Sequence, residues 1–435
     1  MKLFKFFTFF LFKGSGALLT FSYIFLSNKI LSPTEYGIFA LLITFINLGG
    51  AILSFGIPTY IFNIMSSKGS LRQFNEKLKH ILVIVFLISI VFLIFATLFS
   101  DFISLWFFKD SEYGFVISLL GLLIFFVILN RIFSTYFIAV KKPYISTIGD
   151  NFLFPFFITF YLFTSLGIKN FNYDMFLQFT LFLIPLISVF YLIFIKINFS
   201  LLKIKTTIKK YKQILKPCAQ LTLVSASGIL LISSDIIILG LLAEPASVAN
   251  YHIATKIAFV IGLVSISSMS FYYGKSLQLF RKNSIHSLRK QIYKVNFYSL
   301  IASLFILIFI ALTYNQLIKI LFYDIDTTIL KSLIFVLCFG QLINLIFGYQ
   351  GSLLIITKYR STVSYIFVFT LFFNIITSIL AFYAIGVLGV ALVTMLSTLL
   401  RELLLSYFFK KYYGFHPLSY FKFLLNYKNI VVLLK

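Results

Sequence analysis

Charged side chains inside long apolar stretches are the residues of this sequence that could do chemistry. Such charges are costly in a nonpolar environment and tend to point inward, so each one is a candidate functional group. Six residues have this character: Lys29, Arg131, Asp235, Lys256, Arg401 and Glu402. Cations outnumber anions among them by four to two. This excess favours an anionic ligand such as phosphate or pyrophosphate, which arginine binds through a bidentate fork and lysine as a point charge.

Depth along the apolar stretches separates these candidates. Arg131 lies nine residues from the inner end of its stretch, about 14 Å at 1.5 Å per residue, so we expect it near a membrane midplane. Lys29 lies near the outer end of the first stretch, where a lysine can also snorkel to the interface. Arg401 and Glu402 lie at a similar apparent depth in the last stretch. Because neighbouring helical residues do not face each other, we do not expect these two to pair.

Asp235 and Lys256 form the most informative predicted pair. Each lies seven residues from the outer end of its stretch, about 10 Å deep, and the two helices are consecutive and antiparallel. An ion pair is therefore allowed, and His252 lies one turn outward on the same face as Lys256. Two interpretations remain open: a structural pair that holds the helices together, or a counter-ion that releases Lys256 to an anion. Asp235, His252 and Glu402 are the candidate counter-ion or coupling groups.

Signatures of catalysis, cofactors or metals are weak. There is no G-x-x-x-x-G-K-[ST] phosphate-binding loop. Asp324-Ile325-Asp326 matches a metal-binding D-x-D only superficially, because a loop of about ten residues cannot form the required cavity. The four histidines are scattered, and Cys218 and Cys338 fall inside apolar stretches. We therefore expect neither an enzyme nor a bound cofactor.

The elements that position these residues are membrane-spanning helices. The 435 residues are 60% hydrophobic and only 11% charged, whereas soluble domains are about 25% charged. A helix needs about 20 apolar residues to cross a bilayer, and the apolar stretches show no β-barrel alternation. Twelve spans are predicted: 14–32, 37–63, 81–100, 114–140, 145–167, 175–195, 217–242, 249–274, 295–321, 330–356, 362–385 and 387–410.

The basic residues follow a topology rule. Lysine and arginine concentrate in every second connection and at both ends of the chain, so both termini are predicted to be cytoplasmic. This distribution also explains the net charge of +25 without nucleic acid. The longest basic connection, 196–216, predicts two six-helix lobes, 1–195 and 217–410, that enter the membrane in the same direction. An amphipathic cytoplasmic tail, 411–435, is expected to lie on the membrane surface.

Three short motifs of the sequence resemble those of a known transporter family. Leu31-Ser32-Pro33-Thr34-Glu35-Tyr36-Gly37 is similar to an L-x-P-x-[ED]-[YF]-G opening. Ser234-Asp235-Ile236-Ile237-Ile238-Leu239-Gly240, followed by Tyr251-His252-Ile253-Ala254-Thr255-Lys256, resembles the central stretch of that family. Tyr383-Ala384-Ile385-Gly386-Val387-Leu388-Gly389-Val390-Ala391 resembles a late segment, with Ala384 in place of the usual glycine. The family that these motifs resemble is that of the Wzx-type polysaccharide flippases, the oligosaccharide-lipid branch of the multidrug/oligosaccharidyl-lipid/polysaccharide (MOP) exporter superfamily.

The resemblance implies two six-helix lobes around a central cationic cavity in a multi-pass protein of the bacterial inner membrane. It also implies that undecaprenyl-pyrophosphate-linked oligosaccharide, such as an O-antigen or capsule repeat unit, moves from the cytoplasmic to the outer leaflet by alternating access. H⁺ or Na⁺ would drive the step, and polymerase and glycosyltransferases would act in the same pathway. Lys256 matches the basic position of the family's eighth span, and Lys29 is the candidate for the first.

Two alternatives remain, a transporter of the same superfamily and a membrane enzyme of a different functional class. A drug or cation antiporter of the same superfamily is the nearest, and the excess of intramembrane cations argues against it. A polysaccharide polymerase or ligase would carry catalytic residues on a long outer loop. The longest predicted outer loop, Asp101 to Tyr113, has only thirteen residues and no arginine.

Overall fold

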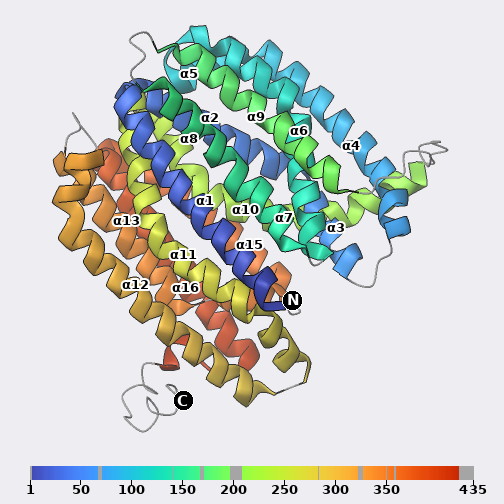
Figure 1. Cartoon of the computed structure of the whole chain (residues 1–435). Coiled ribbons are helices and arrows are strands. Elements are labelled where there is room, and N and C mark those ends of the chain that lie inside the picture. The colour runs from blue at the N-terminus through green and yellow to red at the C-terminus, as the bar shows by residue number, and fades with distance from the viewer. Residues whose placement is uncertain are drawn as a thin grey trace. The chain divides into compact units, whose positions relative to one another are not determined.

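A computed structural model gives the fold of the chain (Figure 1). It describes residues 2–66, 71–140, 142–166, 171–195, 208–282, 284–321, 327–348, 350–356 and 359–420. The Asp324-Ile325-Asp326 motif, most of the predicted basic linker and residues 421–435 lie outside this described part.

The chain forms two compact units, Met1–Ala249 and Asn250–Lys435. The first unit contains the following elements: α1 (Lys2–Ile30), α2 (Pro33–Leu53), α3 (Ile57–Ser66), α4 (Leu71–Leu98), α5 (Ser100–Phe108), η1 (Ser111–Tyr113), α6 (Gly114–Ala139), α7 (Pro143–Thr147), η2 (Ile148–Leu153), α8 (Phe154–Ser165), α9 (Tyr173–Phe194) and α10 (Ile208–Leu242). By contacts, α10 groups with the N-terminal helices, packing on α2, α3 and α5. The division into lobes at 196–216 stays a prediction.

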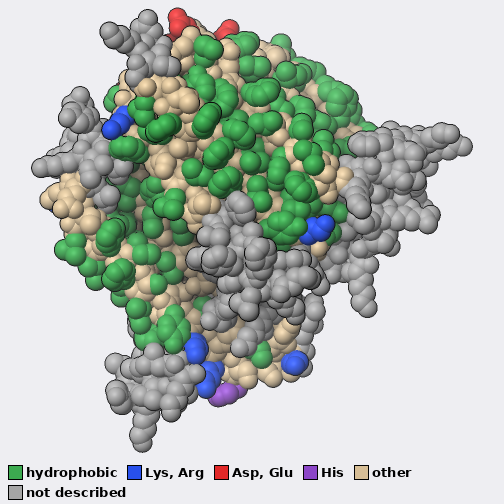
Figure 2. Space-filling view, in the orientation of Figure 1, with side chains coloured by type: hydrophobic (Ala, Val, Ile, Leu, Met, Phe, Trp, Pro, Cys, Tyr) green, Lys and Arg blue, Asp and Glu red, His purple; other side chains and the backbone are tan. Residues whose placement is uncertain are grey.

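The second unit begins within α11 (Pro245–Arg281). Its other elements are α12 (Ile285–Leu321), α13 (Thr327–Phe347), α14 (Gln350–Ile356), α15 (Arg360–Ile385), α16 (Val387–Tyr413) and η4 (Pro417–Ser419). Helix α16 packs against both α13 and α15. In Figure 2, hydrophobic side chains are spread over the whole described surface that the view shows and few charged ones lie among them, as expected of helices that face lipid.

The all-helical prediction is confirmed, and ten of the described helices are long and apolar enough to cross a membrane. The two other predicted spans are also helical: 14–32 overlaps α1 as far as Ile30, and 217–242 forms the larger, C-terminal part of α10. The described part of α10 contributes a shorter apolar helix, Ala226–Leu242. The chain is therefore a multi-pass membrane protein.

Three predicted elements were wrong in detail. The single span 330–356 is divided into α13 and α14, with Gly348 at a φ of 75° after the end of α13. The single span 37–63 is divided into α2 and α3, because Phe55 and Gly56 adopt left-handed backbone angles, with φ of 46° and 66°. Such angles end a helix and are easiest for glycine. The predicted outer loop Asp101–Tyr113 is also not a plain loop, since α5 and η1 occupy most of it. Its apolar residues continue the helical pattern beyond the predicted end of the third span.

The start of α2 shows what one family-like motif does. Ser32 is the N-cap, and its side chain accepts a hydrogen bond from the Glu35 amide at 3.3 Å. The Glu35 carboxylate accepts the Ser32 amide at 2.7 Å, which completes a capping box. Pro33 occupies the first turn, where its missing N–H is harmless. This motif therefore has a structural function in starting the helix.

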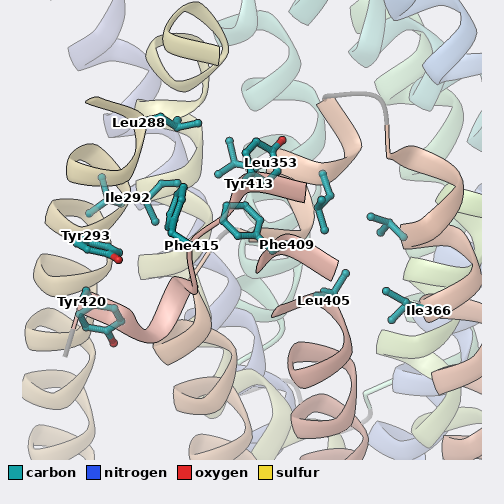
Figure 3. Packing of buried hydrophobic residues seen from close by; sticks show 13 residues of the cluster. Leu288, Ile292, Tyr293, Leu353, Ile366, Leu405, Phe409, Tyr413, Phe415 and Tyr420 are labelled. Carbon is teal, nitrogen blue, oxygen red and sulfur yellow. The ribbon is translucent and has the colours of Figure 1, made fainter. Parts of the chain in front are cut away.

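The second unit has an aromatic core near the end of α16 (Figure 3). Phe409, Tyr413, Phe415 and Tyr420 are buried there together with Tyr293 of α12. The start of the predicted tail, as far as Tyr420, is thus packed into the second unit, and the placement of the tail on a membrane surface stays a prediction. The reason for this packing is its aromatic side chains, which bury a large apolar area within the protein.

Candidate functional site

The Arg131 side chain passes over α2 at a glycine and hydrogen-bonds to the backbone of that helix. Helix α6 carries Arg131 and contacts α2, α3, α4 and α9. The Arg131 Nη2 donates to the backbone carbonyl of Asn47 at 2.7 Å. A Cβ at Gly50 would lie 2.7 Å from Arg131 Nε and 2.5 Å from Val127 Cγ1. Gly50 therefore leaves the space through which the arginine stem passes.

A carboxylate that the sequence analysis missed lies beside this arginine. Asp150 falls inside the predicted span 145–167 and occupies the π-helix η2 between α7 and α8. Its carboxylate accepts hydrogen bonds from the hydroxyls of Ser134, of Tyr191 at 2.6 Å and of Ser146 at 3.5 Å. A charge inside a predicted span was the signal that could have found it. With Asp150 included, the candidate charges inside the predicted spans are four cations and three anions, so the excess of cations is smaller than predicted.

Asp150 and Arg131 attract each other electrostatically. Ser134, which donates to Asp150, follows Arg131 by three residues on α6, a rise of about 4.5 Å along the helix. Arg131 is partly exposed, and Asp150 and Asn47 are exposed. The structure thus brings together a cation, a carboxylate and hydroxyl groups within one unit, on helices that are otherwise apolar.

The π-helix η2 packs closely against Tyr191 of α9 on one side and against Gly16 of α1 on another. A Cβ at Gly149 would lie 2.3 Å from the Tyr191 hydroxyl oxygen, so the absence of a side chain lets this tyrosine reach Asp150. A Cβ at Gly16 of α1 would lie 2.1 Å from the Asn151 carbonyl oxygen. Gly16 is therefore a packing position, where α1 approaches the backbone of the π-helix closely. π-Helices occur frequently at functional sites.

Arg401 and Glu402 do pair, which corrects the prediction that they would not. The Arg401 Nη2 lies 2.9 Å from Glu402 Oε1, and the Arg401 Nε donates to the same oxygen at 3.0 Å. Their Cα–Cβ bonds diverge, but the long arginine stem bends back. Gln350 of α14 donates to the other carboxylate oxygen at 3.0 Å and to the Glu402 carbonyl at 2.8 Å. The group joins α14 to α16.

The remaining candidates lie in different surroundings. Lys29 is exposed in the last turn of α1, with its Nζ 4.7 Å from the centre of the Phe25 ring. Asp235 is buried in the first unit, whereas His252 is buried and Lys256 half-buried in the second. The pairing of Asp235 with Lys256 stays a prediction. Among the residues whose positions are described, no three His, Cys, Asp or Glu side chains could hold a metal ion together.

Comparison with solved structures places the fold. The chain is similar to the lipid II flippase MurJ in an inward closed conformation, with 16% identity, a TM-score of 0.70 and coverage of 98% of this chain and 91% of that chain. It is also similar to an inward-facing multidrug resistance MATE family transporter of the MOP superfamily, at 13% identity, a TM-score of 0.69 and coverage of 92% and 94%. A MOP superfamily transporter from Pyrococcus furiosus matches at 13% identity, with a TM-score of 0.58 and coverage of 92% and 95%.

These likenesses establish a MATE- and MurJ-like fold, and the proteins that share it are transporters and flippases rather than enzymes. No curated protein matches the chain. The model of one family, described as polysaccharide biosynthesis protein, matches residues 3–272, which is more than half of the sequence. The chain therefore belongs to the polysaccharide biosynthesis protein family, with the fold of the MOP superfamily.

Proposed function

We propose that this protein is a flippase that moves undecaprenyl-pyrophosphate-linked oligosaccharide from the cytoplasmic to the outer leaflet of the bacterial inner membrane. Membership of the polysaccharide biosynthesis family and the flippase-like fold support this class of function. In the proposal, the step occurs by alternating access and is coupled to an ion gradient. Glycosyltransferases and a polymerase of the same pathway supply and use the lipid-linked glycan.

The position of Arg131 inside a membrane-spanning helix is the observation that carries the proposal. Its guanidinium lies eight residues before the end of α6 at Ala139, about 12 Å along the helix axis. One of its N–H groups is used by the Asn47 carbonyl, and the others have no hydrogen-bond partner among the described residues. A guanidinium fork matches the oxygens of a phosphate. We propose Arg131 and Lys256 as the cations that contact the pyrophosphate.

Local partners favour structural functions for the other cations. Lys29 lies over Phe25, and the charge of Arg401 is offset by Glu402. Asp235 and His252 stay the proposed counter-ion groups for Lys256. A drug transporter is the competing candidate, favoured by the likeness to a MATE transporter and by the carboxylate of Asp150.

Complementation tests this proposal. A flippase-null strain that carries Arg131→Ala should insert the protein at normal levels but lack surface glycan, whereas Arg131→Lys should retain part of the export. Lys290→Ala, which removes an exposed cation from the second unit, is the matched control and should export normally. Normal glycan with Arg131→Ala, or drug resistance without glycan export by the unchanged protein, would contradict the proposal.

A further inference from the structure

The Asp150 carboxylate accepts hydrogen bonds from several hydroxyls, yet the residue remains exposed. Hydroxyls of Ser134, Ser146 and Tyr191 donate to it, but the residue keeps more than a third of its surface exposed. A carboxylate in a membrane span is rare and marks a functional path by default, including the path of protons. The flanking Asn151 is also exposed, so the polar surface continues along the π-helix.

The hydroxyl network can satisfy Asp150 with or without a proton. Ser134 Oγ lies 2.8 Å from Ser146 Oγ as well as within hydrogen-bond distance of Asp150. A hydroxyl has one donor and two acceptor positions. When Asp150 is ionised, Ser134 donates to the carboxylate, and the single Ser146 proton is donated either to Ser134 or to the carboxylate. When Asp150 is protonated, its O–H can donate to Ser134, which then donates to Ser146. Where Ser146 donates to Ser134 in the ionised state, the Asp150–Ser134 and Ser134–Ser146 hydrogen bonds are thus present in both states, and only their direction reverses.

Arg131 is the charged group that responds to this proton. Of the described side chains on the elements that pack against η2, the charged or titratable ones that interact with Asp150 are Arg131 of α6 and Tyr191 of α9. Helix α7 contributes Ser146, and α1 meets η2 through Gly16. An ionised Asp150 offsets the guanidinium charge, whereas a neutral Asp150 leaves the full positive charge for an anion.

We propose that Asp150 binds a proton and thereby raises the affinity of Arg131 for the pyrophosphate of the cargo. The inference rests on the proposed function, because it uses Arg131 as the pyrophosphate contact. The chemistry is a single protonation: the carboxylate takes a proton from water and becomes a neutral carboxyl. Binding linkage is reciprocal, so the anion must strengthen proton binding by the same factor. We expect a coupling of about tenfold, within the usual range for linked sites.

The test measures the binding of undecaprenyl pyrophosphate to the full-length protein in detergent across a pH series. The wild type should bind about tenfold more tightly when Asp150 is protonated. Asp150→Asn should bind tightly at every pH, apart from the titration of the lipid itself, which both proteins share. Asp174→Asn removes an exposed carboxylate at the start of α9 and should keep the wild-type profile. The infrared carbonyl band of the protonated Asp150 carboxyl should be absent from the spectrum of Asp150→Asn and present in that of Asp174→Asn.

A second variant covers the case in which Asp150→Asn does not fold. Tyr191→Phe removes one hydroxyl that stabilises the ionised carboxylate, so the midpoint of the binding profile should move to higher pH. An unchanged midpoint would overturn the inference, as would parallel profiles for the wild type and Asp150→Asn. A dependence on Na⁺ at constant pH would assign the carboxylate to a metal cation instead. If the wild type binds no undecaprenyl pyrophosphate at any pH, the proposed function fails, and the inference fails with it.

Discussion

Gly37 of α2 lies directly against the backbone of Pro245, at the first residue of α11. A Cβ added at Gly37 would lie 1.8 Å from the Pro245 carbonyl oxygen and 2.5 Å from its carbonyl carbon. Both neighbours are backbone atoms, which cannot rotate away as a flexible side chain can. The final glycine of the family-like motif at residues 31–37 is thus explained by a close helix approach.

Gly37→Ala should destabilise the protein by about 1–3 kcal/mol or more, because the added methyl overpacks a backbone contact. Thermal unfolding in detergent measures this. Gly14→Ala is the matched control: Gly14 lies in α1 with no heavy atom within 4 Å of its would-be Cβ. Replacing a helical glycine there should stabilise by about 0.5–1 kcal/mol. Equal melting temperatures for the two variants would contradict the close approach.

Gly50→Ala should impair export without unfolding the protein. The new methyl would meet side-chain atoms of Val127 and Arg131, which can move, so the cost falls on the position of the guanidinium. Gly49→Ala is the neighbouring control, since its methyl would meet only the flexible end of Ile124 at 3.1 Å. Surface glycan and protein level are measured together. Similar export by both variants would show that the path of the Arg131 stem does not matter.

Arg401→Ala should lower stability, because it leaves the buried Glu402 carboxylate without its cation. Breaking a buried ion pair from one side costs about 3–5 kcal/mol. Arg401→Met combined with Glu402→Gln should recover most of this loss, since no buried charge remains. Unfolding is followed in detergent and glycan export in cells. A stable Arg401→Ala protein that fails to export would make Arg401 a cargo contact.

His416 should make the second unit less stable in acid. Its Nδ1 accepts the Leu418 amide at 3.2 Å, which a protonated ring could not do. Burial, and then the charge of Lys410, lowers the pKa of His416 below its ordinary value of 6.5. The folded state thus binds fewer protons, so this contribution is complete above about pH 6.5 and declines as the pH falls below it.

His416→Asn tests this dependence, because asparagine keeps a cap acceptor that does not titrate. Melting temperatures of both proteins are compared at pH values on either side of 6.5. The variant should lose less stability in acid than the wild type, whose other histidines are shared. If both proteins lose the same amount of stability at low pH, the titration of His416 is not the cause of that loss.

Reporter fusions test the predicted topology. Fusions after Pro143, Thr206 and Ser284 should report the cytoplasm, and those after Ser111 and Asp326 the outside, because the basic connections face inward. A reporter found on the opposite side from the expected one would contradict the prediction that both termini are cytoplasmic.

The sequence by itself determined that the chain is a helical membrane protein, because hydrophobic length and low charge are properties of each segment alone. Arg131 could also be found in this way, since a cation deep in an apolar stretch needs no partner to be noticed. The motif at residues 31–37 indicated the family, and its serine, proline and glutamate act locally as helix-start signals.

Only the tertiary structure decided which charges act together. Asp150 meets Ser134 and Tyr191, which lie sixteen and forty-one residues away, so no local pattern records their contact. Arg401 pairs with its neighbour because a long stem can bend and Gln350 approaches from another helix. Side-chain reach and helix packing set such contacts, whereas residue spacing gives only the direction of the Cα–Cβ bond.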